Sequence, residues 1–164
     1  MRTTAILLAF CSVGAGAAPT LCQPHEKVVF SCEVGRAQKV VSLCASRDLS
    51  AEGGALAYRF GLPGHIELEF PRDRTLASAK QFRYAHYSRY QVDRTEVSFN
   101  LGQYSYSVFS YFDGEEKPGT RQGVRVLRGK NESVLSCRAE AATDFSVLEA
   151  AVPCDGESAL ATCR

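Results

Sequence analysis

The chain has 164 residues, of which 45% are hydrophobic and 23% are charged. This length fits one domain, and the composition is that of a folded protein rather than a disordered, collagen-like or multi-span membrane chain. The 19 Lys and Arg residues nearly balance the 18 Asp and Glu residues, so no global charge favours nucleic acid or an anionic membrane.

The start of the chain has the three regions of a secretory signal peptide. Arg2 supplies the basic region, residues 5–13 are apolar, and Ala15-Gly16-Ala17 is a small-residue cleavage site. The apolar run is shorter than the roughly 20 residues that cross a bilayer. We therefore expect a signal peptide over residues 1–17, a single domain over residues 18–164, no membrane span, and a periplasmic or secreted location.

In an exported chain, the number of cysteines that remain after cleavage indicates whether they form disulfides. Cleavage removes Cys11, and an even number of cysteines remains: Cys22, Cys32, Cys44, Cys137, Cys154 and Cys163. Metal binding is the alternative to disulfides, but no C-x-x-C motif occurs and only His25 lies near a cysteine. The pattern therefore predicts complete pairing, although many connectivities are open. We expect Cys32 with Cys44 across adjacent strands, Cys154 with Cys163 in the tail, and Cys22 with Cys137 between the ends of the chain.

From about residue 26 to residue 137, apolar residues alternate with polar ones, which is typical of half-buried strands. Residues 28–32 and 39–44 predict a first hairpin. In the next pair, a loop over residues 61–65 would give the following opposed pairs: Phe60 with Ile66, Tyr58 with Leu68, and Arg59 with Glu67 on the solvent face.

Two further hairpins are predicted. Gly102-Gln103 suits a tight turn that sets Leu101 opposite Tyr104 and Phe99 opposite Tyr106. Residues 123–127 and 133–137 form the last hairpin. Beyond it, Thr143 or Asp144 is suited to cap a short helix with Phe145 and Leu148 facing inward. About eight strands with little helix predict an all-β, antiparallel sandwich or barrel that disulfides cross-link.

Catalytic and metal motifs are missing. There is no G-x-S-x-G, H-E-x-x-H or phosphate loop. His65-Ile66-Glu67 matches half of a zinc deaminase motif, but Glu157 stands where the second cysteine of the other half belongs. His25, His65 and His86 are scattered without a recognisable partner, which favours surface residues over a catalytic base. We expect no enzyme, no cofactor and no metal.

Residues 81–93, QFRYAHYSRYQVD, interleave cations with aromatic rings. Such a surface can contact bases, sugars or an anionic partner. The alternative is an ordinary strand with arginines in solvent, because Phe82, Tyr84 and Tyr90 share one parity and would face the core. Arg and Tyr are enriched in binding hot spots. The candidate binding surface therefore consists of Arg83, Tyr87 and Arg89.

Four ordered segments carry a resemblance: VVFSCEVGRAQKVVSLCAS, YRFGLPGHIELEFP, YSYSVFS and GVRVLRGKNESVLSCR. Over roughly residues 22–137, the chain resembles a family of small secreted proteins from Proteobacteria. The resemblance implies an exported β domain and supplies no catalytic residues. A weaker resemblance, at Phe30-Ser31-Cys32, is to small periplasmic β-barrel inhibitors of C-type lysozyme, whose Ser-Gly inhibitory loop has no clear counterpart here.

These features predict an exported β domain that acts by binding another protein, for example as an inhibitor or immunity factor. An envelope-associated enzyme of unrecognised type and a structural protein are the alternatives. We expect no nucleic-acid partner.

Overall fold

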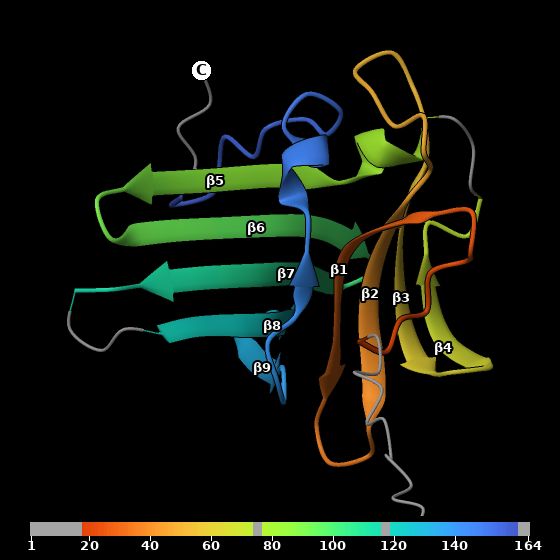
Figure 1. Cartoon of the computed structure of the whole chain (residues 1–164), viewed down its shortest axis with the longest axis horizontal. Coiled ribbons are helices and arrows are strands. Elements are labelled where there is room, and N and C mark those ends of the chain that lie inside the picture. Colours follow the sequence, from red (N-terminus) through yellow and green to blue (C-terminus); the bar gives the residue numbers. More distant parts are fainter. Residues whose placement is uncertain (1–17, 74–76, 116–118, 161–164) are drawn as a thin grey trace, which may run out of the picture.

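The computed structural model describes residues 18–73, 77–115 and 119–160. The first sheet contains β1 (Lys27–Val34), β2 (Lys39–Ala45), β3 (Leu56–Leu62), β4 (His65–Phe70) and β10 (Ala142–Thr143). The second contains β5 (Arg83–Arg89), β6 (Val92–Leu101), β7 (Tyr104–Asp113), β8 (Gly119–Arg128) and β9 (Asn131–Ser136). Both sheets are antiparallel, in the orders β10-β1-β2-β3-β4 and β5-β6-β7-β8-β9 (Figure 1). The all-β sandwich prediction is confirmed.

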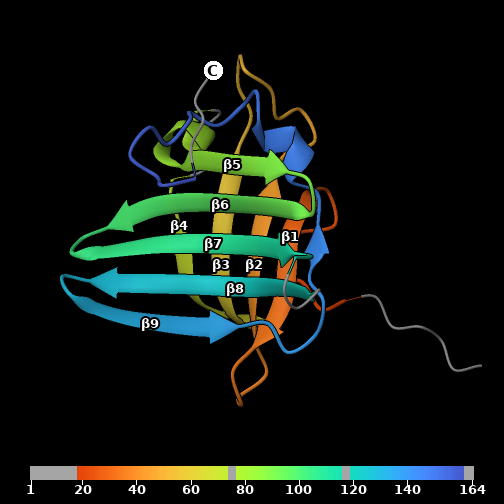
Figure 2. The same ribbon diagram turned by 90° about the vertical axis from the view of Figure 1, so that its left-hand side faces the viewer.

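The two sheets pack face to face, and the strands of one run across those of the other (Figure 2). Phe99 on β6 lies in the core between them. Its ring centroid is 4.3 Å from that of Phe70 and 5.0 Å from that of Tyr58, both on the first sheet. Burial raises the pKa of Tyr58 well above its usual value. Each large apolar side chain buried here stabilises the fold by about 1.5 to 3 kcal/mol.

The predicted hairpins form, and alternation fixes which residues face the core. Ser31 and Ser42 lie opposite each other in the β1–β2 hairpin. In the β6–β7 hairpin, Leu101 lies opposite Tyr104 and Phe99 opposite Tyr106, as predicted. Gly102 in that turn has a φ of +60°, which an L side chain rarely adopts. The β8–β9 hairpin also forms.

The register of the β3–β4 hairpin differs from the prediction by two residues. Tyr58 lies opposite Phe70 and Phe60 opposite Leu68, because the turn is only Pro63-Gly64 and a bulge beside Gly61 inserts Glu67 as an extra residue in β4. A Cβ at Gly61 would collide with the His65 carbonyl oxygen, so only glycine allows this close approach. A shift of two residues keeps each side chain on its predicted face. It changes the cross-strand partner of Arg59 from Glu67 to Glu69.

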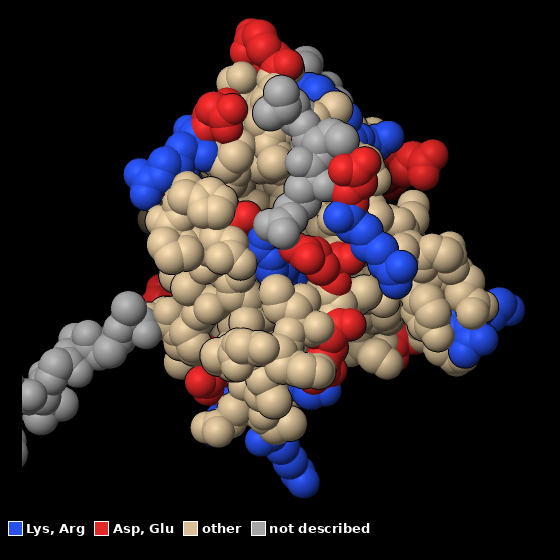
Figure 3. Space-filling view, turned by 90° about the vertical axis from the view of Figure 1, so that its right-hand side faces the viewer, with Lys and Arg blue, Asp and Glu red and all other residues tan. Residues whose placement is uncertain are grey.

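Residues 18–26, here called the N-terminal strap, pack on the outer face of the first sheet. The Leu21 amide donates to Ser42 Oγ at 3.0 Å, and Ser31 Oγ donates to the Pro19 carbonyl at 2.7 Å. Arg59, predicted to lie in solvent, is 0% exposed beneath this strap. Among the described residues, charged side chains of both signs lie interspersed over this side of the molecule (Figure 3).

Arg59 is held by charged and polar partners from the strap and from β4. Its guanidinium donates to both carboxylate oxygens of Glu26, at 2.6 and 2.9 Å, and to Glu69 at 2.8 Å. It also donates to the Leu21 carbonyl at 3.2 Å. Hydrogen bonds to the two carboxylates raise the pKa of Arg59, although burial opposes them. The buried charge is thus compensated, as a buried ion requires.

Disulfides join Cys22 to Cys44 and Cys32 to Cys137. The predicted pairs Cys32–Cys44 and Cys22–Cys137 are wrong. Cys32 lies opposite Val41 rather than Cys44 in the β1–β2 ladder, about 10 Å too far along the strand. The strap brings Cys22 to Cys44 instead, and a bridge between Val34 and Cys137 brings the end of β9 to β1.

Cys154 is also disulfide-bonded. Its predicted partner Cys163 lies outside the described residues, as does the predicted signal peptide, so both stay predictions. Disulfides are typical of proteins that fold in an oxidising compartment outside the cytoplasm. Among the described residues, no helix is long and apolar enough to cross a membrane.

Two predictions near the ends of strands need correction. The C-terminal helix η2 (Phe145–Leu148) is a 3-10 helix; Leu148 is buried as predicted, but the Asp144 side chain does not cap it. Asp144 instead accepts a hydrogen bond from Ser146 Oγ at 2.6 Å. Tyr90 is 83% exposed rather than in the core, because β5 ends at Arg89 and the chain turns there.

Candidate functional site

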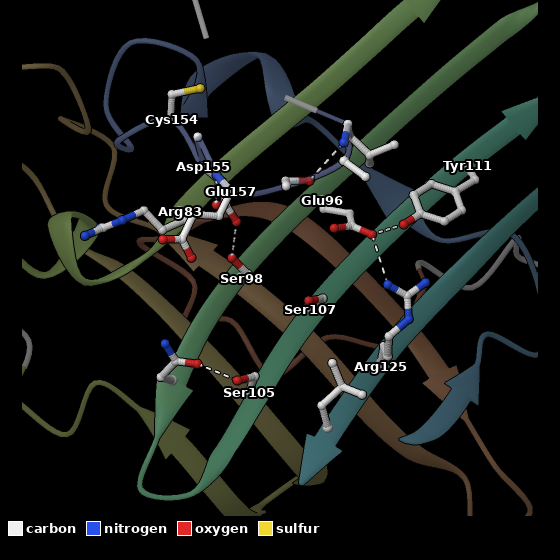
Figure 4. A pocket seen from close by; sticks show the side chains of 16 residues that line it. Arg83, Glu96, Ser98, Ser105, Ser107, Tyr111, Arg125, Cys154, Asp155 and Glu157 are labelled. Carbon is white, nitrogen blue, oxygen red and sulfur yellow. Dashed lines mark hydrogen bonds and ion pairs between the residues drawn. The ribbon is translucent and has the colours of Figure 1, made fainter. Parts of the chain in front are cut away.

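The outer face of the second sheet carries a groove of about 790 Å³ (Figure 4). Its floor is built from β6, β7 and β8, whose alternate residues share this face. Ser98 lies opposite Ser107 and Asn100 opposite Ser105. The floor is therefore rich in hydroxyl and amide groups that both donate and accept hydrogen bonds.

Residues 154–160 form one wall of the groove. This segment is fixed to the edge of β5, because the Tyr84 amide donates to the Pro153 carbonyl at 2.9 Å and the Asp155 amide donates to the Tyr84 carbonyl at 2.8 Å. Ser98 Oγ on the floor also donates to the Asp155 carboxylate at 3.1 Å. The wall is thus hydrogen-bonded both to the sheet edge and to the floor.

Glu96 is a carboxylate on the floor of the groove, with 14% of its side chain exposed. The Tyr111 hydroxyl donates a hydrogen bond to it, and Arg125 Nη1 donates another at 3.1 Å. Both groups donate to the same carboxylate oxygen, Oε1 of Glu96. Figure 4 shows the three side chains converging on one end of the groove.

Cations and aromatic rings stack beside this cluster. The Arg125 guanidinium lies 5.6 Å from the Phe109 ring centroid. The Tyr111 ring has Arg94 at 6.0 Å and Arg121 at 5.8 Å, measured from the guanidinium carbon to the centroid. These contacts are within the range of cation–π attraction and hold the side chains in place. This end of the groove is consequently preorganised.

The predicted binding residues are all on this outer face, but they do not form one cluster. Arg83 is exposed and lines the groove; its guanidinium donates to the carbonyls of Lys80 and Phe82 at 2.9 and 2.8 Å. Tyr87 is half-buried, and exposed Arg89 lies at the far end of β5. The candidate binding surface therefore borders the groove at Arg83 and continues along β5 to Arg89.

Sequence reasoning missed Glu96, Tyr111, Arg125 and Asp155. The alternation of β6 and β7 could have placed Glu96 and Tyr111 outward, since Val97 and Val108 mark the inward parity. That alternation could not have revealed that residues 153–155 return to the edge of β5.

The described residues contain one group of side chains close enough to share a metal ion: Cys22, Glu26 and Cys44. Cys22 and Cys44 form a disulfide, so neither is a thiolate ligand. Glu26 is bound to Arg59. This group is better explained as part of the strap than as a metal site. The ring of His86 lies 3.0 Å from the Asp93 carboxylate at the surface.

Comparisons with protein-family models, curated proteins and solved structures find no match for this chain. The resemblances drawn from the sequence therefore stay predictions.

Proposed function

We propose that this protein is an exported binding domain that engages another protein through the outer face of its second sheet. The observation that supports this most is the groove of about 790 Å³ on that face. On the matching face of the first sheet, the strap covers Ser31, Ser42 and Arg59, which are 0% exposed. Such a domain could act, for example, as an inhibitor or as an immunity factor.

Preorganisation supports binding. Glu96, Tyr111 and Arg125 are already held by one another, so a partner would not have to order these side chains when it docks. The serine hydroxyls of the floor offer hydrogen bonds in several directions. Exposed Arg83 adds a guanidinium to the lining of the groove, and Arg is one of the residue types enriched in binding hot spots.

An envelope-associated enzyme is the alternative, with Glu96 on the floor and Asp155 on the wall as its acid and base. Each of these carboxylates already accepts hydrogen bonds from within the protein, which supports a structural and binding role over proton transfer. Turnover of cell-wall material that Glu96→Gln abolishes would instead support the enzyme.

The test begins with capture of a partner from envelope or culture extract by the exported protein. The affinity of the purified partner is then measured for defined variants. The triple variant Arg83→Ala, Tyr87→Ala, Arg89→Ala should bind at least about ten-fold more weakly, because hot-spot truncations cost 2 kcal/mol or more. Ser107→Trp, which fills the groove from its floor, should weaken binding at least as much.

The matched control is Arg36→Ala, Arg72→Ala. It removes two exposed guanidinium groups that lie outside the second sheet. This control should bind like the wild type, and all variants should keep the wild-type melting temperature within a few degrees. Equal affinity of the triple variant, Ser107→Trp and the wild type would contradict the proposal.

A further inference from the structure

The charges that line the groove do not balance. Among the described residues it is lined by two guanidinium groups and three carboxylates: Arg83 and Arg125, and Glu96, Asp155 and Glu157. Arg125 is already ion-paired with Glu96 at 3.1 Å. Arg83 donates to the backbone carbonyls next to it, and Figure 4 shows its guanidinium directed away from the floor. Both cations are thus engaged, and the excess charge that faces a ligand is negative.

The carboxylates of the groove have hydrogen-bonding capacity left for a ligand. Tyr111 and Arg125 both donate to Oε1 of Glu96, and no described residue donates to its Oε2. The Glu157 side chain is exposed, and no described residue forms an ion pair or hydrogen bond with its carboxylate. An ionised carboxylate has about four acceptor sites, so the groove offers a ligand more charged acceptors than charged donors.

These carboxylates lie around one residue of the floor, Ser98. Asp155 accepts from Ser98 Oγ at 3.1 Å, and its carboxylate also accepts from the Glu157 amide at 3.2 Å. Glu96 is two residues from Ser98 on the same face of β6, which places it about 7 Å further along the strand. Figure 4 shows the two wall carboxylates above Ser98 and Glu96 beside it. A cation over Ser98 would therefore have carboxylates on two sides.

We infer that the groove receives an extended segment of the protein partner, whose arginine side chain lies over Ser98 between Glu96 and the wall; this rests on the proposed function. A guanidinium has five N–H donors in a planar fork, so it can reach carboxylates on two sides, whereas the donors of lysine share one atom. At about 790 Å³, the groove has room for more than one side chain. The Ser107 hydroxyl and the Asn100 amide can then bond to the backbone of the segment.

The first test needs no purified partner. It uses two capped five-residue peptides of glycine, one with arginine at its centre and one with citrulline, which has nearly the same shape but no charge. Each is titrated to about 10 mM into the 15N-labelled exported protein. The arginine peptide should shift the amides of Ser98, Ser107 and Glu157 in a saturable way. The citrulline peptide should bind at least about ten-fold more weakly, because hydrogen bonds between charged groups are the stronger ones.

Variants of the groove assign the effect to its carboxylates. Glu96→Gln, Glu157→Gln should bind the arginine peptide at least about ten-fold more weakly. Glu157→Gln alone changes only an exposed side chain and should also weaken binding, whatever Glu96→Gln does to folding. The matched control Glu52→Gln, Glu140→Gln removes two exposed carboxylates outside the groove. It should bind like the wild type and keep its melting temperature within a few degrees.

Three results would overturn the inference: no shift at the three amides up to about 10 mM, equal binding of the arginine and citrulline peptides, or shifts there from an N-acetylglucosamine trimer instead. Failure of the proposed function is distinguishable. A purified partner that Ser107→Trp weakens but Glu96→Gln, Glu157→Gln does not would support a protein ligand in the groove and overturn the role of arginine.

Discussion

The outer faces of the two sheets are built from similar polar residues but differ in what lies over them. On the first sheet, Ser31, Ser42 and Arg59 are 0% exposed because the strap covers them. On the second, Ser98, Ser107 and Tyr111 line an open groove. The same alternation of strand residues therefore produces a third packed layer on one side of the sandwich and an accessible surface on the other.

The difference also concerns charge. Arg59 is sealed between Glu26 and Glu69, where its charge depends on those partners. On the second sheet, Arg89 and Glu115 are ion-paired but open to solvent, each with 45% of its side chain exposed. Buried and exposed ion pairs have very different energetic consequences when one partner is lost. This contrast leads to three predictions.

The largest expected effect is the loss of Arg59. Arg59→Ala removes the Arg59 charge that neutralises Glu26, whose side chain is only 8% exposed under the strap. Removing one member of a buried ion pair costs about 3 to 5 kcal/mol. Urea unfolding at pH 7 should show a loss of this size.

Arg125→Ala is the matched control, because it removes an ion-paired arginine from the other outer face. Its side chain is 28% exposed, and solvent can hydrate the Glu96 that remains. The double variant Arg59→Met, Glu26→Gln should recover part of the stability that Arg59→Ala loses. If Arg59→Ala cost no more than Arg125→Ala, the two faces would not differ as described.

The second prediction concerns the disulfide that fastens the strap. Cys22 and Cys44 are separated by 22 residues, so replacing both with alanine should cost about 3 kcal/mol through the entropy of the unfolded chain. The Leu21 amide should also exchange faster with solvent if the strap loosens. The groove should be unaffected, so binding of a purified partner should not change. A loss of partner binding would show instead that the two faces are coupled.

The fold was largely predictable because each strand has one core face. Val97 and Phe99 fix the orientation of β6, and a two-residue turn then fixes the register of β7. The β3–β4 register was not predictable in this way, because a shift of two residues preserves every face, and the short turn and the bulge in β4 together decide between the alternatives. Local patterns thus determine which side a residue occupies more reliably than which residue it meets.

The strap and the groove could not be predicted from the sequence, and the reason is a different one. Arg59 occupies an outward position, and outward arginines are normally in solvent. Its burial depends on Glu26, which lies 33 residues earlier in the chain. The groove wall likewise depends on Asp155, 57 residues after its partner Ser98. Segments without regular secondary structure carry no periodic signal that shows where they dock.

The smallest expected effect is at the exposed pair on the second sheet. Arg89 donates two hydrogen bonds to the Glu115 carboxylate, at 2.5 and 2.7 Å, and these hold the pKa of Glu115 below its usual value. Arg89→Ala should therefore raise the pKa of Glu115 back toward the ordinary value for glutamate, which an NMR titration of its side chain would measure. Arg83→Ala, the control on the same strand, should leave that titration unchanged.

The direction of the pH effect follows from this pKa. A pKa that is lower in the folded state stabilises the fold at pH values above the unfolded pKa, and the contribution disappears as pH falls through the folded value. In Arg89→Ala, unfolding should thus depend less on pH on the acid side. At pH 7 the urea midpoint should stay close to that of the wild type, because solvent screens an exposed pair. A fall as large as that expected for Arg59→Ala would mean that Arg89 is part of the packed structure and not of an accessible surface.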